Sequence, residues 1–222
     1  VSALASIVMV TAACLLTEEP VVLRNVPRIK DVIVMRRLIE SLGAQVEELD
    51  ATSWRITARD LRPADLDPDL CRKIRASILV AGPMSARVAG EFKLPPPGGD
   101  VIGRRRLDTH ILALRALGSE VTYDRGFTFK SDGLHGADFL MDEASVTATE
   151  NAIMAAVTAR GDTVIRNAAS EPHVQELCHF LNGLGAKIEE IGSNTLHIHG
   201  VTKLHGGEFT IGPDYLEVIS FV

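Results

Sequence analysis

The sequence has few cysteines, few aromatic residues and no excess of basic charge. Only 5% of its 222 residues are aromatic, and the three cysteines, Cys14, Cys71 and Cys178, lie far apart with no CxxC spacing. An odd number of widely spaced cysteines argues against a disulfide framework or a zinc site and favours reduced structural thiols in a cytosolic protein. Cys14 and Cys178 each lie in an apolar helical pattern, so we expect both to be buried. The net charge of −6 argues against general nucleic-acid binding, because that function normally requires a basic surface.

The sequence also lacks an apolar run long enough for a membrane span. The N-terminal run VSALASIVMVTAACLL ends at residue 16 and leads directly into Thr17-Glu18-Glu19-Pro20. A span needs about 20 residues, and a signal peptide would carry basic residues before its apolar region. We therefore expect a buried helix over residues 3–16 and no contact with a membrane. The first residue is Val1 rather than Met, which suggests that the chain begins inside a longer protein.

What the sequence does contain is an internal repeat. LRNVP in the N-terminal part matches IRNAA in the C-terminal part, and ESLGAQVEE matches NGLGAKIEE in the same order. A Leu-Gly pair followed by a small residue recurs at Leu42, Leu117 and Leu184. Each of these pairs ends a stretch of helical periodicity, where a glycine can adopt the left-handed conformation of a helix C-terminus. The repeat predicts three modules, at about residues 1–65, 66–140 and 141–212.

Each module has the pattern β-α-β-α-β-β. In the first copy we expect a strand at 21–26, a helix at about 31–42, and strands at 45–49 and 54–58. The segments ASIVMVTAACLL, ASILVAG and AIMAAVTA are apolar on all sides, so one helix of each module should lie inside a shared core. We predict one α/β domain over residues 1–212, and residues 213–222 as the first helix of a second domain.

The stretch LPPPGGDVIGRRRLDTH, residues 94–110, concentrates proline, glycine and arginine. The prolines stiffen it, and Gly98 and Gly99 would let backbone amides approach a ligand closely. The arginines at 104–106 offer bidentate contacts to phosphate or carboxylate groups. The stretch is interpreted either as a lid over an anionic substrate or as a surface hairpin with solvated arginines, and Asp108 as a ligand-binding residue or an N-cap.

Several motifs resemble one family. GGDVIGRRRLDTH is similar to the loop GG-C-x-IG-x-RP-x-DLH of UDP-N-acetylglucosamine enolpyruvyl transferases, and LLTEEPVVLRNVPRIKDV, RASILVAGP, DEASVTATEN and RNAASEP also match. The similarity covers nearly the whole chain. It implies an inside-out α/β barrel built from two domains of three modules each, of which this chain matches one. It also implies a cytoplasmic enzyme that transfers the enolpyruvyl group of phosphoenolpyruvate to UDP-N-acetylglucosamine in peptidoglycan synthesis, with no metal or cofactor.

The resemblance assigns roles to individual residues. Asp100 stands at the tip of the loop in place of the family's cysteine, where a carboxylate can act as a general acid. Arg105 matches the arginine that contacts the phosphate of phosphoenolpyruvate, and Arg75 matches a second active-site arginine. The remaining assigned positions bind the UDP-sugar: Arg106, Leu107, Asp108 and Thr109 at the uracil ring, and Ser145, Val146 and Thr147 at the diphosphate.

Ser145 is also a candidate N-cap of the helix that follows. The two roles are compatible, since a helix N-terminus favours a bound phosphate group. His197 and His199 alternate along one expected strand, and we interpret them as a solvated face rather than as metal ligands.

Besides Asp100 and Thr109, further departures from the family pattern bear on activity. Leu4 and Ala5 stand where the family has a Lys-Asn pair, Arg106 replaces a loop proline, and Glu143 replaces a lysine present in some members. Two alternatives to an active enzyme of this family therefore stay open. One is a non-catalytic paralogue that binds a nucleotide sugar, and the other is a transferase for another uridine nucleotide.

Overall fold

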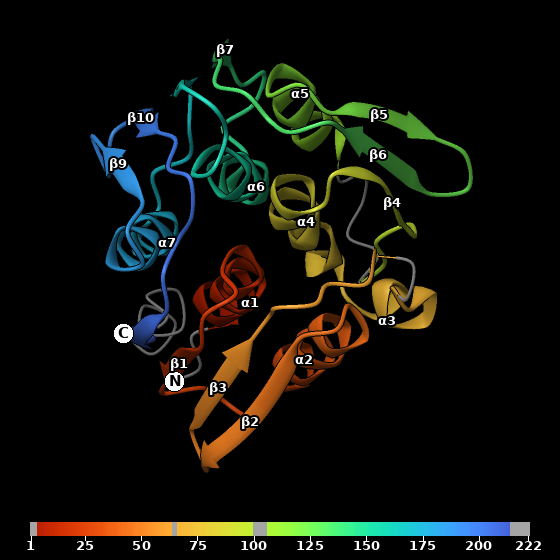
Figure 1. The fold of residues 1–222 in the computed structure, drawn as a ribbon, viewed down its shortest axis with the longest axis vertical. Coiled ribbons are helices and arrows are strands. Elements are labelled where there is room, and N and C mark those ends of the chain that lie inside the picture. Colours follow the sequence, from red (N-terminus) through yellow and green to blue (C-terminus); the bar gives the residue numbers. More distant parts are fainter. Residues whose placement is uncertain (1–3, 64–65, 100–105, 214–222) are drawn as a thin grey trace, which may run out of the picture.

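Three central helices organise the structure, a computed structural model that describes residues 4–63, 66–99 and 106–213. Figure 1 looks almost along α1 (Leu4–Ala13), α4 (Ala81–Arg87) and α6 (Val146–Ala156), which lie in the middle, with three β-sheets around them. This is the inside-out arrangement that the sequence predicted, with helices in the core and sheets at the surface. Of the predicted start of a second domain, at 213–222, residues 214–222 lie outside the described residues.

The central helices are buried on all sides. Residues 6–13 of α1 are buried, and so are residues 148–156 of α6. The chain enters α4 through a 3-10 helix, η3 (Arg75–Val80), and leaves α1 through another, η1 (Cys14–Leu16). α4 packs against α6, and α1 packs against η3. The buried residues of the three helices belong to one hydrophobic cluster, which confirms the predicted shared core.

The cysteines belong to this interior, as predicted for Cys14 and Cys178 from the apolar patterns around them. All three are buried and unpaired. Burial raises the pKa of Cys71 and Cys178 to about 12, so both stay as thiols at neutral pH.

One outer helix of each unit lies between a central helix and a sheet: α2 (Lys30–Ser41), α5 (Asp108–Ala116) and α7 (Pro172–Gly183). All three end in the same way. Gly43, Gly118 and Gly185 have φ of 96–100°, and the residue after each glycine donates its N–H to the carbonyl five residues back. This hydrogen bond, next to a glycine with positive φ, is typical of the Schellman motif. The motif explains why the Leu-Gly pair recurs in the sequence.

The first and third sheets have the same strand order. The first sheet runs β11-β1-β3-β2 and the third runs β7-β8-β10-β9. The strands of the first sheet are β11 (Gly207–Thr210), β1 (Val21–Arg24), β3 (Ser53–Thr57) and β2 (Gln45–Asp50). Those of the third are β7 (Asp138–Leu140), β8 (Asp162–Arg166), β10 (Thr195–His199) and β9 (Lys187–Glu189). The second sheet, β4-β6-β5, contains three strands among the described residues: β4 (Gly90–Leu94), β6 (Phe127–Ser131) and β5 (Glu120–Tyr123).

In two sheets, the outermost strand comes from a different unit of the fold. β11 pairs in parallel with β1, and β7 pairs in parallel with β8. The sheets therefore do not coincide with the repeats drawn from the sequence: residues 138–140 join the third sheet, and residues 207–210 return to the first. This return brings the C-terminal end of the described chain beside its N-terminal unit (Figure 1) and closes the ring of three units.

The repeated Arg-Asn dipeptide fastens these parallel strands. Asn25 and Asn167 both adopt left-handed backbone conformations, with φ of 61° and 57°, which asparagine tolerates better than most residues. Their side chains donate to Ile211 O (2.8 Å) and Met141 O (3.0 Å), just beyond β11 and β7. The preceding arginines pair with carboxylates of the same strands: Arg24 with Glu208, and Arg166 with Asp138. The match of LRNVP with IRNAA thus reflects the same set of contacts between parallel strands, made twice.

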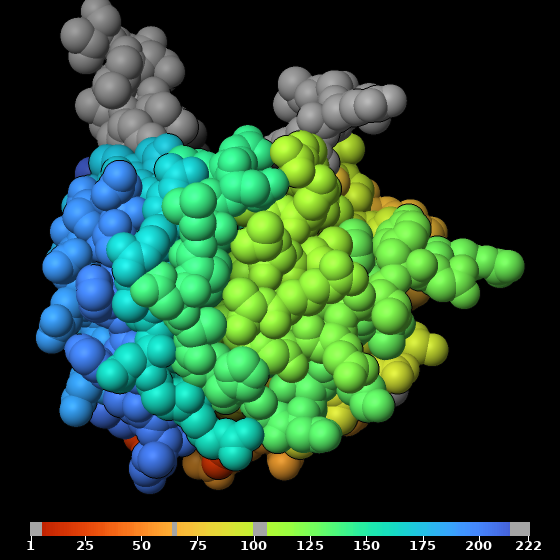
Figure 2. Space-filling model, turned by 90° about the horizontal axis from the view of Figure 1, so that it is seen from above, coloured from red at the N-terminus to blue at the C-terminus, as the bar shows by residue number. Residues whose placement is uncertain are grey.

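The remaining helix, α3 (Pro68–Lys73), precedes η3 and packs against α2. Figure 2 shows the face where the second and third units meet in a continuous surface, from which the tip of the β5–β6 hairpin projects. Among the described residues, no helix combines the length and the apolar character that a membrane crossing requires.

Candidate functional site

The predicted site residues that the structure describes lie where helices begin. Arg75 is the first residue of η3, residues 106–109 lead into α5, and residues 145–147 lead into α6. Asp100 and Arg105 lie outside the described residues, so their predicted roles stay predictions. The other eight come from three separate parts of the sequence, and hydrogen bonds connect these parts.

Asp142, in the turn before α6, joins the two predicted substrate-binding segments. Its carboxylate accepts from Arg106 Nη2 (3.0 Å) and from Thr109 Oγ1 (2.9 Å). The Thr109 side chain is buried, whereas Arg106 and Asp142 are partly open to solvent. Arg106 and Thr109 are two positions where the chain departs from the family motif, and both bind the same carboxylate.

Asp108 is the first residue of α5, and Leu107 occupies the N-cap position. The N-cap interpretation of Asp108 is therefore wrong. Arg106 Nε donates to Asp108 Oδ2 (2.8 Å), and this hydrogen bond, followed by backbone N–H contacts, lowers the pKa of the Asp108 carboxyl. Asp108 is charged at neutral pH, and its exposed carboxylate can accept hydrogen bonds. Leu107 packs partly against the core.

The start of α6 is open for an anion. Ser145 occupies the predicted N-cap position, but its side chain makes no capping hydrogen bond. The first backbone N–H groups of a helix have no partner inside the helix, and they carry the positive end of its dipole. Val146 and Thr147 are half-buried in this first turn. The turn can therefore receive a phosphate group without displacing a side-chain cap.

A buried polar network lies beneath this turn. His110 of α5 is 2% exposed; its Nε2 lies 3.2 Å from Thr147 Oγ1, and its Nδ1 lies 2.8 Å from Asn151 Nδ2. Asn151 is fully buried in α6, where it accepts from Gly82 N (2.8 Å) and donates to Ile78 O (2.9 Å). Burial, and then the positive charge of Arg75, lowers the pKa of His110 to about 3. The network links η3, α4, α5 and α6.

Arg75 faces this region from η3. Its Nη2 lies 3.5 Å from the carbonyl oxygen of Arg106, at the limit of a hydrogen bond. This contact places the guanidinium near the start of α5.

Gly98 and Gly99 have a different role from the one predicted. Their N–H groups donate to Cys71 O (3.0 Å) and Arg72 O (3.2 Å), so these amides do not face a ligand. A Cβ atom at Gly98 would lie 1.8 Å from Arg72 O, and one at Gly99 would lie 2.8 Å from Arg75 N. The two glycines are needed because the segment before Asp100 packs directly on the backbone that carries Arg75.

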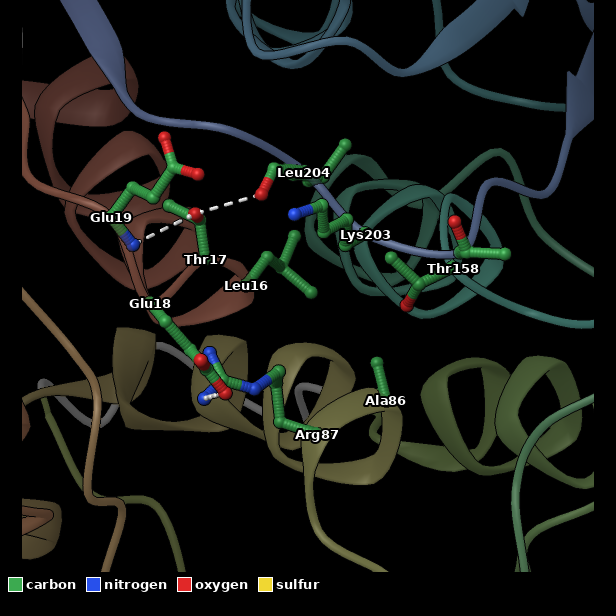
Figure 3. A pocket seen from close by; sticks show the side chains of 10 residues that line it. Leu16, Thr17, Glu18, Glu19, Ala86, Arg87, Thr158, Lys203 and Leu204 are labelled. Atoms are coloured by element: carbon green, nitrogen blue, oxygen red, sulfur yellow. Dashed lines mark hydrogen bonds and ion pairs between the residues drawn. The ribbon is translucent and has the colours of Figure 1, made fainter.

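A cavity of about 310 Å³ lies at the opposite ends of the central helices. Figure 3 shows its lining where α1, α4 and α6 end, with Arg87 facing Glu18 and with Lys203 near Leu204. Arg87 donates to Leu15 O (2.9 Å), in η1 after the end of α1, and to Ala58 O (3.2 Å), after β3. A cation at the C-terminal end of a helix complements the negative end of its dipole. The predicted anion-binding residues lie at the N-terminal ends instead, which agrees with the direction of the helix dipoles.

His197 and His199 are about half-exposed on β10 and lie near carboxylates, with His199 Nδ1 2.8 Å from Asp162 Oδ1. The part of the chain that the structure describes contains no group of three or more His, Cys, Asp or Glu side chains able to hold a metal ion.

Sequence reasoning assigned no role to Asp142, His110 and Asn151. All three stand inside motifs that were recognised, RRRLDTH and DEASVTATEN. The sequence signal for them was that they are polar residues close to positions with an assigned role. Their connection across helices depends on the packing of α4, α5 and α6, which no single segment encodes.

The sequence of the chain is similar to those of known enzymes. Residues 2–222 match the family described as EPSP synthase (3-phosphoshikimate 1-carboxyvinyltransferase). A UDP-N-acetylglucosamine 1-carboxyvinyltransferase from Treponema denticola is 56% identical over 211 residues, and one from Bradyrhizobium diazoefficiens is 57% identical over 213 residues. These matches cover 95% and 96% of this chain, but 49% of each relative. The chain thus spans about half the length of the curated relatives it matches.

Two solved structures share the fold. The enolpyruvyl transferase NikO from Streptomyces tendae superposes with a TM-score of 0.83 at 23% identity, over 98% of this chain and 52% of that chain. EPSP synthase from Acinetobacter baumannii superposes with a TM-score of 0.70 at 16% identity, over 94% of this chain and 47% of that one. The predicted fold class, an α/β enolpyruvyl transferase-like barrel domain, is confirmed.

Proposed function

The chain belongs to the EPSP synthase family, and on that premise we propose that it is one half of an enzyme that transfers enolpyruvyl to a UDP-sugar. The donor is phosphoenolpyruvate, the acceptor is the 3′-hydroxyl of UDP-N-acetylglucosamine, and phosphate is released. The identities of 56% and 57% to carboxyvinyltransferases named for this acceptor support the choice of substrate. The reaction is the first committed step of peptidoglycan synthesis and takes place in the cytoplasm.

One observation carries the proposal: the two segments assigned to the UDP moiety are joined to each other. Asp142 binds both Arg106 and Thr109, and His110 contacts Thr147. A uridine held by residues 106–109 would therefore direct its diphosphate toward the first turn of α6. The open N–H groups of that turn and the charge of Arg75 stabilise the negative charge of the phosphates.

The reaction itself requires residues from the loop before α5. Asp100 is proposed as the general acid at the loop tip, and Arg105 as the cation that neutralises the phosphate of phosphoenolpyruvate. The lid role predicted for this loop from the sequence is part of the proposal, since exclusion of water would keep hydrolysis from competing with transfer. A second domain of the same enzyme supplies the opposite wall of the site. Neither nucleic acid nor membrane takes part.

The test uses the full-length protein and measures phosphate release from phosphoenolpyruvate. Release should depend on added UDP-N-acetylglucosamine. Arg75→Ala and Asp100→Asn should each lower kcat/KM by about a hundredfold, the scale at which removal of one electrostatic or general-acid contact acts. Arg59→Ala, at an exposed arginine away from the helix N-termini, is the matched control and should leave the rate unchanged. Binding of both ligands without phosphate release would refute the proposed activity.

The substitutions Leu4 and Ala5 favour a second candidate, a non-catalytic paralogue that binds the nucleotide sugar. Under that function the wild-type protein binds UDP-N-acetylglucosamine without turnover, and the double change Leu4→Lys and Ala5→Asn restores phosphate release. Unchanged activity after this restoration contradicts it. The third candidate, a transferase for another uridine nucleotide, predicts that UMP, UDP and UDP-N-acetylglucosamine compete in an order that does not favour the acetylglucosamine group.

A further inference from the structure

The buried network of His110, Asn151 and Thr147 has a fixed direction, and this direction determines how the Thr147 hydroxyl can act. The side-chain amide of Asn151 has two well-defined neighbours. Gly82 N–H must face an acceptor, and Ile78 C=O must face a donor. The side-chain oxygen of Asn151 therefore points to Gly82 and its NH₂ group to Ile78. The opposite orientation would place two buried donors against each other.

The Asn151 NH₂ group has a second hydrogen, and it points at His110. Asn151 Nδ2 and His110 Nδ1 are 2.8 Å apart, so Nδ1 must be the acceptor. A neutral imidazole with an accepting Nδ1 carries its proton on Nε2. Nε2–H then donates to Thr147 Oγ1 at 3.2 Å.

The neutral state of His110 is held from two sides. Protonation would place an Nδ1–H against the NH₂ group of Asn151, inside a region where the His110 side chain is 2% exposed. Arg75 is the charged group that acts on the imidazole from η3, and it opposes a second positive charge. Asn151 and Thr147, the neighbours from α6, are uncharged. The direction of the hydrogen bonds therefore stays the same over the neutral pH range.

We infer that His110, oriented by Asn151, is a positioning residue that donates to Thr147 and so leaves the Thr147 hydroxyl proton free for an anion. The hydroxyl has one proton, and because its oxygen accepts from His110 the proton has to point elsewhere. Thr147 belongs to the half-buried first turn of α6, where the backbone N–H groups have no partner inside the helix. The inference rests on the proposed function in one respect: it takes the anion to be the diphosphate of a UDP-sugar.

Two variants at position 110 separate the two hydrogen bonds of the imidazole. His110→Asn keeps an acceptor near the Nδ1 position and loses the donor toward Thr147. His110→Gln keeps an NH₂ donor near the Nε2 position. We expect His110→Asn to weaken the binding of UDP and UDP-N-acetylglucosamine to the full-length protein about tenfold, the range of one hydrogen bond to a charged group. His110→Gln should restore most of that loss.

The ligand series shows where the effect acts. Uridine lacks the diphosphate, so its affinity should be the same in wild type and in His110→Asn. Thr147→Val removes the hydroxyl with little change in shape, and it should cause the same loss for UDP as His110→Asn. The double variant should lose no more than either single variant, because both remove the same contact. His179→Asn and Thr122→Val, at exposed positions, are the matched controls.

A spectroscopic measurement tests the direction of the bonds independently of any ligand. In the full-length protein, the ¹⁵N shifts of the His110 imidazole should show a protonated Nε2 and an unprotonated Nδ1 at every pH from 6 to 8. Protonation on Nδ1 would overturn the inference. It is also overturned when His110→Asn and His110→Gln weaken uridine and UDP equally, or when the losses of the double variant add. Absence of any UDP binding by the wild-type protein refutes the proposed function instead, and the ¹⁵N result still decides the geometry.

Discussion

Replacing Gly82 with alanine should destabilise the protein, although the same change in an ordinary helix is stabilising. Gly82 lies in α4 where this helix crosses α6. An added Cβ atom would meet Asn151 O at 2.6 Å and Asn151 Oδ1 at 2.8 Å. Real Cβ atoms essentially never make contacts this short, and the nearest atom is backbone, so the two helices would have to separate. Separation also lengthens the hydrogen bond from Gly82 N to Asn151 Oδ1, now 2.8 Å.

The magnitude follows from three opposing contributions. Helix propensity favours alanine over glycine by about 1 kcal/mol. Overpacking of a closed interface costs about 1–3 kcal/mol, and loss of one buried hydrogen bond costs about 1 kcal/mol more. The net expectation is a loss of about 1–3 kcal/mol in the free energy of unfolding. Gly183→Ala is the matched control, because Gly183 is an exposed residue of α7 where an added Cβ would have no other atom within 4 Å, and it should stabilise by about 0.5–1 kcal/mol.

Thermal and urea unfolding of the full-length protein measure both variants. One kcal/mol corresponds to about 2–4 °C in Tm for a domain of this size. Gly82→Ala should therefore melt several degrees below wild type, and Gly183→Ala slightly above it. Equal or higher stability of Gly82→Ala would refute the close approach of α4 and α6, and with it the orientation of Asn151.

Three further predictions concern buried or linked polar groups. The pKa of His110 is about 3 in the folded state and about 6.5 in the unfolded state, so as the pH falls its imidazole takes up a proton only on unfolding. Between pH 7.5 and 5 the free energy of unfolding of wild type should therefore fall by about 2 kcal/mol more than that of His110→Asn, measured by urea unfolding. Burial, with a contribution from Glu171, raises the pKa of the Glu150 carboxyl, so just above its ordinary pKa of 4.5 this carboxyl ionises only in the unfolded state. Glu150→Gln should therefore gain stability relative to wild type as the pH rises from 4 to 7. A constant difference in stability between the two proteins would contradict this. Asp142→Ala should destabilise by about 1–2 kcal/mol because it leaves the buried Thr109 hydroxyl without its acceptor, whereas Asp142→Asn keeps an acceptor and should lower Tm less.

Local sequence patterns were sufficient for the elements and their repeat. The helix at 31–42 and the strands at 45–49 and 54–58 were expected within one residue or so of α2 (30–41), β2 (45–50) and β3 (53–57). Side chains alternate across a strand and recur on one face of a helix, so these patterns depend on neighbours in the sequence. The Leu-Gly pairs were equally informative, because a left-handed helix C-terminus is a property of a few consecutive residues.

Packing between distant segments decided what the sequence left open. The return of residues 207–210 to β1 depends on parallel pairing, which local patterns do not specify. Gly98 and Gly99 are typical of a ligand-binding loop, yet their N–H groups donate to the carbonyl oxygens of Cys71 and Arg72. In the same way, Arg106 and Thr109 were visible as departures from a motif, while their common partner Asp142 was not.

The sequence by itself therefore determined the three modules, the buried central helices and the family resemblance, because these follow from periodicity and short motifs. The tertiary structure alone decided that the beginnings of η3, α5 and α6 meet, and that His110, Asn151 and Gly82 form one network. Hydrogen-bond direction in such a network is set by groups far apart in the chain, such as Gly82 and Asn151, which are separated by 69 positions. Only the folded packing of α4 against α6 brings those groups within bonding distance.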